Sequence, residues 1–450
     1  MTTPSIVRKR PHLSPAGSGP QDTPPYWLRT AVCYSAIAVI LFGPIAFGAV
    51  EPWAMFILHG GAVVVFLLWL ASVMTGPKPQ IEFQLIHLPP FIFAAIVIYQ
   101  MVWARSGYRH ETATEFMNYV AYGLIFLIAT DIFRKEREVR SLILSLAVLG
   151  FLLAVIGSVQ EFTADGKLYW VRLPQNPAGT FGPYVNRNHY AGFVEMLFPF
   201  ALLGALKPNL ENGKRIVLGF AALLMVATVF LCGSRGGFIS VALQMIFLAV
   251  LVLWRSRNVG IILTLALAFV MTGAFGTWLG SDRLIGRLGD LKNTGGFSRL
   301  QVAKDSIQMF EDRPLTGWGL GTFPVIYPKY RTFATDLYVN EAHNDFVQLL
   351  VETGIVGFAA GLFLLVVVFR RGFAQLRDPD YSSWRTAAVA ASLAGVVGIT
   401  VHSLFDFNLQ IPANALIFYV LCAIAGTTSG PQAEIIRRVE RSASRSVVDL

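Results

Sequence analysis

The chain has 450 residues, of which 54% are hydrophobic and only 14% are charged, and its mean hydropathy is +0.57. A soluble domain carries about 25% charged residues, so this composition excludes an ordinary soluble protein and indicates one embedded in a membrane. The net charge of +9 does not indicate a nucleic-acid partner. The basic residues lie mostly in short connections between apolar segments, where orientation in the membrane explains them.

Apolar segments of about 20 residues, the length that crosses a bilayer, recur along almost the whole chain. Residues 1–26 precede them and are rich in Pro, Ser and Thr, which is typical of a disordered tail. The sequence therefore predicts an all-α, polytopic membrane protein with about twelve transmembrane helices. The expected spans lie at about 27–49, 52–75, 88–104, 115–133, 139–161, 188–206, 214–232, 236–254, 259–280, 345–369, 384–405 and 411–428.

The short connections at 131–140 and 369–385 are rich in Lys and Arg, which predicts that they face the cytosol. Both termini then lie in the cytosol, and the long loop at 281–344 faces the opposite side. The expected divisions are a cytosolic tail at 1–26, N-terminal helices at 27–161, a membrane domain at 162–428 that includes the long loop 281–344, and a second cytosolic tail at 429–450.

The loop at 281–344 is far longer than a plain connector needs to be. Such loops are usually functional or disordered, and aromatic residues such as Trp318 and Tyr327 argue against disorder. Helical spacing within the loop predicts an amphipathic helix that lies against the membrane surface. The apolar stripe of this helix consists of Leu300, Ala303, Ile307 and Phe310.

The segment "EAHNDFVQLLVETG", residues 341–354, places a histidine directly before an apolar span. Asn344 or Asp345 can cap the helix that follows, which puts His343 at the outer membrane surface. Glu352 shares a helix face with Asp345 and lies roughly 10 Å deeper, where a carboxylate is costly unless it meets water or a partner. His343 and Glu352 are therefore either the base and the support of a hydrated cavity, or an interfacial histidine and a glutamate that bonds neighbouring helices.

Two arginines follow small residues close to helix starts. Arg235, in "CGSRGG", has flanking glycines that expose backbone N–H groups at a helix N-terminus, a combination that suits an anion. Arg299, in "GGFSRL", opens the amphipathic helix and could bind a phosphate together with Lys304. Either arginine could instead extend toward lipid headgroups.

Two further polar clusters lie at the outer ends of spans. In "PYVNRNHYAGF" the amide and aromatic side chains suit sugars, but they also suit a membrane interface. In "HSLFDFNLQIPAN", His402 and Asp406 are four residues apart, and a network at a helix end is the favoured interpretation. All these elements lie on one side of the membrane. That convergence favours an anionic, lipid-linked substrate over a pore or carrier, which would spread polar groups through the midplane.

These motifs, together with "GWGLGTF" in the long loop, resemble the signature of the O-antigen ligase and polymerase superfamily over about residues 180–425. The resemblance implies a helical fold similar to the lipid-dependent glycosyltransferases known as GT-C. It also implies glycan transfer at the outer face of the bacterial inner membrane. The implied donor is a glycan on polyprenyl diphosphate, and the acceptor is a lipid A-core, another glycan or a protein.

By the same resemblance, Arg235 and Arg299 would hold the donor diphosphate, and His343 would take the proton from the acceptor hydroxyl. The residues expected to support the site or contact sugars are Asn186, Arg187, Asn188, His189, Trp318, Asn344 and Glu352. A single displacement at the anomeric carbon would invert its configuration. Two arginines can neutralise the leaving diphosphate, so no strong general acid is needed. No cofactor or metal is expected, because metal-dependent members of the wider class place paired acids in the first outer loop, which here holds only Glu51.

Several alternatives stay open at this point. A flippase or transporter of polysaccharide precursors would need charged residues along a path through the midplane. A membrane scaffold would need no base at position 343. Within the transferase class, the shared motifs do not separate a polysaccharide polymerase from an O-antigen ligase or a protein O-oligosaccharyltransferase. The further partners expected for the protein are membrane lipids and other polysaccharide assembly proteins.

Overall fold

The computed structural model describes nine stretches of the chain. They are residues 26–76, 81–103, 106–175, 179–208, 210–256, 259–279, 295–334, 338–377 and 384–428. The two expected cytosolic tails lie outside these ranges except for Tyr26, as does the part of the long loop before Gly295.

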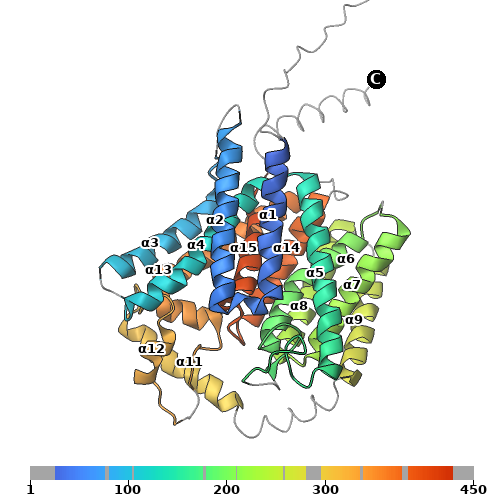
Figure 1. The fold of residues 1–450 in the computed structure, drawn as a ribbon. Helices are drawn as coiled ribbons and strands as arrows, with labels where there is room; N and C mark the ends of the chain where they lie inside the picture. Colours follow the sequence, from blue (N-terminus) through green and yellow to red (C-terminus); the bar gives the residue numbers. More distant parts are fainter. Residues whose placement is uncertain are drawn as a thin grey trace, which may run out of the picture.

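The described part of the chain is helical and contains no β-strand (Figure 1). The helices are α1 (Tyr26–Ile45), α2 (Pro52–Met74), α3 (Leu88–Val102), α4 (Arg109–Ile132), α5 (Glu136–Thr163), α6 (Arg187–Ala205), α7 (Asn212–Leu231), α8 (Arg235–Ser256), α9 (Val259–Leu279), α11 (Gly295–Asp312), α12 (Phe323–Ile326), α13 (Asp345–Leu376), α14 (Trp384–His402) and α15 (Pro412–Gly426).

Each expected span coincides with one of these helices, so the prediction of an all-α polytopic membrane protein is confirmed. Within the described ranges, nine helical segments are long and apolar enough to cross a membrane. α6 is not among these nine, and α15 is a shorter apolar helix of 15 residues. α6 is interrupted by Pro199 and carries the buried carboxyl of Glu195, which sets it apart from a plain lipid-facing span.

The helices differ sharply in burial. Of the 18 residues that form the apolar stretch of α14, 72% are buried inside the protein, whereas 28% of the corresponding stretch of α2 are buried. Phe56, Val64 and Leu67 of α2 are 77%, 56% and 57% exposed, which in water would be a large apolar patch. We infer that α6 and α14 form the centre of the bundle and that α2 faces lipid.

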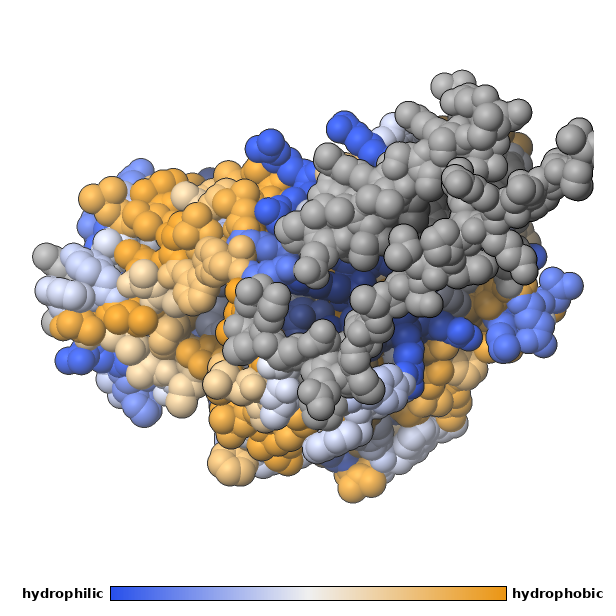
Figure 2. All heavy atoms as spheres, turned by 90° about the horizontal axis from the view of Figure 1, so that it is seen from above, coloured by the Kyte–Doolittle hydropathy of each residue, from blue (hydrophilic) through white to orange (hydrophobic). Residues whose placement is uncertain are grey.

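Polar contacts gather at two opposite ends of the bundle. α1 begins at the upper end of the bundle in Figure 1. Near the start of α1 and the end of α4, Arg29 forms an ion pair with Asp131 at 3.4 Å, and Arg134 pairs with Glu82. Viewed onto this end, Figure 2 shows hydrophilic atoms near the centre with hydrophobic atoms around them. α11 and α12 lie at the other end (Figure 1), as expected for a loop on the far side of a membrane.

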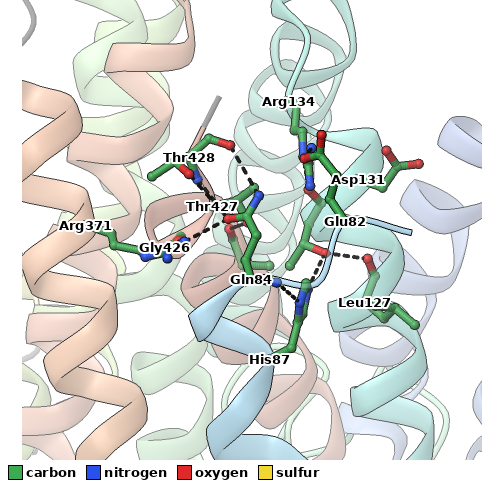
Figure 3. Close-up of polar contacts among 12 residues, drawn as sticks. Glu82, Gln84, His87, Leu127, Asp131, Arg134, Arg371, Gly426, Thr427 and Thr428 are labelled. Carbon is green, nitrogen blue, oxygen red and sulfur yellow. Dashed lines mark hydrogen bonds and ion pairs between the residues drawn. The ribbon is translucent and has the colours of Figure 1, made fainter. Parts of the chain in front are cut away.

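Figure 3 shows how the upper end is held together. The backbone N–H of Gln84 donates to Nδ1 of His87 at 2.9 Å, so the ring proton is on Nε2, which faces Thr130 Oγ1 at 3.0 Å. Arg371 of α13 donates to Gln84 Oε1 at 2.8 Å and contacts the carbonyl of Gly426 in α15 at 3.4 Å. These contacts tie the start of α3 to the ends of α4, α13 and α15.

The expected amphipathic helix is present as α11, and the face that packs against the protein lies beside the predicted stripe. Val302 and Met309 are 3% and 0% exposed, whereas Leu300 and Ile307 of the stripe are 58% and 54% exposed. The buried face carries Asp305, whose Oδ2 accepts from the Tyr327 hydroxyl at 3.0 Å. The face of α11 that carries Asp305 therefore packs against the protein. Leu300 and Ile307, two residues of the predicted apolar stripe, are exposed instead.

Candidate active site

His343 lies directly before α13, in the left-handed region with φ +53°, which non-glycine residues rarely adopt. Asn344 caps α13: its Oδ1 accepts from the N–H groups of Phe346 at 3.0 Å and Val347 at 3.1 Å. The same side chain donates from Nδ2 to the carbonyl of Leu404 at 3.0 Å. The start of α13 is thus docked on the turn after α14, and this fixes the backbone that carries the histidine.

Asp406, in that turn, is the partner of His343. Their Nδ1 and Oδ1 atoms are 3.4 Å apart, and the Asp406 side chain is only 2% exposed. Burial alone would raise the pKa of Asp406, but the hydrogen bond from His343 and the nearby His189 and Arg299 together lower it below its usual value. The carboxylate stays ionised, holds the proton on Nδ1, and leaves Nε2 of His343 available as a base.

The other oxygen of Asp406 binds two residues that come from different helices. Asn188 of α6 donates to Oδ2, and the guanidinium of Arg299 in α11 lies 3.8 Å from the same atom. Arg299 also donates to the carbonyl of Phe405 at 3.0 Å. One buried carboxylate therefore connects His343 to Arg299, which the sequence placed far apart.

A polar cavity of about 410 Å³ opens beside this carboxylate. It is lined by Arg187, Asn188, Gly233, Arg235, Gly236, Arg299, His402, Phe405 and Asp406. Basic side chains outnumber the one carboxylate, so the cavity suits an anion.

The sequence around Arg235 explains its position at this cavity. Gly233 adopts φ +67° and turns the chain after α7, and Ser234 Oγ then accepts from the N–H of Gly237 at 3.2 Å. Arg235 is the first residue of α8 and is exposed. Among the described residues no carboxylate pairs with it, so its charge and the N-terminus of α8 are available to a ligand.

Most of the predicted site residues meet here. Asn186 caps α6 by accepting from the N–H of Asn188 at 2.9 Å, which sets Arg187 at the cavity wall. The ring of His189 packs on Phe407 at 4.6 Å, and the ring of His343 contacts the same Phe407 at 5.1 Å. The structure thus places the predicted base, both predicted arginines and the predicted cluster of α6 around Asp406.

Glu352 and Trp318 lie apart from the cavity and hold the long loop on α13. Glu352 is 1% exposed, and its oxygens accept from the N–H groups of Gly321 at 2.9 Å and Phe323 at 3.1 Å. The backbone N–H of Trp318 donates to the carbonyl of Val351 at 3.0 Å. The interpretation of Glu352 as a group that bonds its neighbours matches these contacts, while a role with substrate stays a prediction.

Replacing Glu352 by alanine is expected to lower the free energy of unfolding by about 2–5 kcal/mol, because two buried N–H groups lose their acceptor. Thermal unfolding and proteolysis within 300–340 measure this effect. Glu311→Gln, at an exposed position of α11, is the control. If Glu352→Gln stayed fully stable but lost all transfer activity, Glu352 would act on substrate rather than on the loop.

Sequence reasoning missed the roles of Asp406, His402 and Glu195. The first two were assigned to a network at a helix end, and Glu195 was not singled out. Glu195 is fully buried in α6, and its carboxyl group forms a hydrogen bond with His402 Nδ1 at 3.1 Å. A carboxyl inside an apolar span is costly unless it has a partner or a function, and that signal was present in "VEMLFPF".

The bundle and its two polar ends define a multi-pass membrane protein. Residues 220–364 match the family model described as O-antigen ligase, a range that contains Arg235, Arg299 and His343. This match confirms the resemblance to the O-antigen ligase and polymerase superfamily.

The chain is also similar to the protein named "Probable peptidoglycan glycosyltransferase FtsW" of Dichelobacter nodosus (strain VCS1703A). The two are 23% identical over 309 residues, which cover 64% of this chain and 70% of that protein. Both comparisons support a membrane glycosyltransferase or ligase family. Asp406, His402 and Asn188 lie outside the matched family range, so the cavity extends beyond the domain that the model describes.

Proposed function

We propose that this protein transfers a glycan from a polyprenyl-diphosphate donor to a hydroxyl acceptor at the outer face of the bacterial inner membrane. The observation that carries the proposal is the buried Asp406, which contacts a candidate base, His343, and a candidate diphosphate ligand, Arg299. The match to the O-antigen ligase family supports this class of donor.

The donor diphosphate occupies the basic cavity in this scheme. Arg235 and Arg299 contribute positive charge, and the N-terminus of α8 contributes backbone N–H groups. Arginine forms paired hydrogen bonds with phosphate oxygens, and charge neutralisation makes the diphosphate a better leaving group. The polyprenyl chain stays in the bilayer beside the bundle.

The acceptor hydroxyl is activated by His343. As its oxygen bonds to the anomeric carbon, its proton passes to Nε2, and the resulting imidazolium is stabilised by Asp406. The bond from the anomeric carbon to the diphosphate oxygen breaks, and its electron pair leaves with the polyprenyl diphosphate. The proton of His343 then passes to water. One displacement inverts the anomeric configuration.

The acceptor can be a growing glycan, a lipid A-core or a protein, and the glycine- and aromatic-rich loop around Trp318 favours a sugar chain slightly. Purified full-length protein in proteoliposomes, supplied with a polyprenyl-diphosphate glycan and each acceptor class in turn, distinguishes them. Transfer should release one polyprenyl diphosphate for each glycan joined. Movement of the intact lipid-linked glycan across the bilayer without its consumption would instead identify a flippase.

Turnover is expected to be unchanged within about twofold when EDTA is present, because arginines rather than a metal neutralise the diphosphate. Among the described residues, no group of three or more His, Cys, Asp or Glu side chains is arranged to hold a metal ion. Glycan transfer is measured with EDTA and after adding back Mg²⁺ or Mn²⁺. Loss of activity in EDTA that the metal restores would contradict this prediction.

A further inference from the structure

The residues that line the basic cavity include a histidine that the mechanism above does not use. His402, at the end of α14, lines the cavity although its side chain is only 1% exposed. Its Nδ1 lies 3.2 Å and 3.1 Å from the two carboxyl oxygens of Glu195 in α6, which is 0% exposed. His402 and Glu195, two titratable residues from different helices, are therefore paired beside the basic cavity.

The pairing fixes how the His402 ring is oriented. Both carboxyl oxygens lie on the Nδ1 side of the ring, so Nε2 points away from Glu195. Among the described residues, the one hydrogen-bond partner of Nε2 is Ser234 Oγ, at the long distance of 3.5 Å. Ser234 already accepts from the N–H of Gly237. Nε2 is thus weakly satisfied and lies beside the N-terminus of α8.

Gly236 allows this approach. A Cβ at position 236 would lie 2.7 Å from Cδ2 and 2.8 Å from Nε2 of His402, closer than side chains pack. Because Gly236 has no side chain, the imidazole of His402 can pack directly against the first turn of α8. Arg235 is the neighbouring residue in the chain. The guanidinium of Arg235, the backbone N–H groups at the start of α8 and the imidazole of His402 therefore lie at the same cavity.

We propose that His402 is a further ligand of the donor diphosphate, through a hydrogen bond from Nε2–H, and that Glu195 is a positioning residue that orients the ring. This inference rests on the proposed function. Because Nδ1 faces the Glu195 carboxyl, Nε2–H is the donor that the ring has left for a diphosphate oxygen. No proton leaves His402 in the reaction: the ring binds the diphosphate before and after the glycosidic bond forms.

A purely structural ion pair is the competing explanation, since buried pairs of this kind often stabilise helix contacts. A structural role and a ligand role for His402 predict different changes in stability and in donor binding. A structural pair affects the whole fold and all ligands alike, whereas a diphosphate ligand affects donor binding and leaves acceptor binding unchanged.

The test uses full-length protein in detergent with farnesyl diphosphate and inorganic pyrophosphate as probes, and steady-state transfer with donor and acceptor varied separately. His402→Ala is expected to weaken farnesyl diphosphate binding and raise the donor KM by about 10- to 100-fold, the usual loss for one hydrogen bond to a charged group. The acceptor KM should stay within about twofold. Glu195→Gln should give a smaller loss of the same kind.

Two variants guard against misfolding. The double variant Glu195→Gln with His402→Gln keeps a neutral hydrogen-bonded pair, and it is expected to fold while donor binding stays as weak as in His402→Ala, because the Nε2–H donor is gone. Tyr190→Phe is the matched control: it removes a buried hydroxyl of α6 that contacts Thr228 at 2.8 Å, away from the cavity. Its donor KM should equal that of the wild type.

Wild-type affinity for farnesyl diphosphate in both His402→Ala and the double variant would overturn the inference and leave the proposed function intact. Equal losses for donor and acceptor, in step with a lower melting temperature, would assign His402 to structure alone and overturn it as well. If wild-type protein bound neither diphosphate probe, the proposed function itself would fail, and this inference with it.

Discussion

Replacing His343 by asparagine is expected to slow glycan transfer by roughly 10²–10⁴-fold, the usual contribution of a general base. Asparagine is the sharper choice than alanine because it tolerates the left-handed backbone observed at this position, φ +53°, while lacking a basic nitrogen. Protein amount in the membrane and melting temperature should therefore stay close to wild type. His343→Ala should lose as much activity, with some loss of stability.

A variant of the neighbouring carboxylate, Asp406, is expected to lose only part of the activity. Asp406→Asn keeps an oxygen for Arg299 and for the ring of His343, but it removes the negative charge that stabilises the imidazolium, so a partial loss is expected. His110→Ala, at an exposed histidine in the first turn of α4, is the control and should transfer glycan normally. Full activity in both His343 variants would remove the base from the mechanism.

Removing Arg235 is expected to reduce kcat/KM for the donor by about 10²-fold, since a charged hydrogen bond to phosphate contributes about 1.5–3 kcal/mol and arginine can form two. Arg235 has no carboxylate partner among the described residues, so Arg235→Ala should not destabilise the fold. Arg299→Ala should lose at least as much, because Arg299 also contacts Asp406 and the Phe405 carbonyl.

Lysine at either position separates charge from geometry. Arg235→Lys keeps the charge and loses the planar pair of donors, so its kcat/KM should fall between those of wild type and Arg235→Ala. Arg172→Ala is the matched control, because Arg172 lies in the connection between α5 and α6 and pairs with Glu51. Donor kinetics that respond to Arg172 as strongly as to Arg235 would mean that general surface charge, not the cavity, binds the diphosphate.

The spans were predictable because hydropathy is a local property. About 20 consecutive apolar residues must bury their backbone polar groups in helical hydrogen bonds when they enter a bilayer, whatever the neighbouring helices are. The same holds for the caps: Asn344 and Asn186 start α13 and α6 through contacts within three residues. His343, Arg235 and Arg299 were found by their chemistry and by the family resemblance.

The roles of the buried acids were not predictable in that way. His343 and Asp406 are 63 positions apart, Asn188 and Asp406 are 218 apart, and His402 and Glu195 are 207 apart. Nothing in the segment around Asp406 shows that it faces His343 rather than its neighbour in the chain, His402. Glu352 likewise has the depth of a cavity residue, yet it binds the backbone of the loop at 321–323.

The amino-acid sequence by itself determined a helical membrane protein, the approximate positions of its spans and the residue types able to bind an anion. Only the tertiary structure decided which helices share the cavity and which carboxylate serves which histidine. The physical reason is that helix formation in a bilayer is decided within each segment. The partner of a buried charge is decided instead by the packing of α6, α8, α11, α13 and α14 against one another, where an unpaired charge would be too costly to bury.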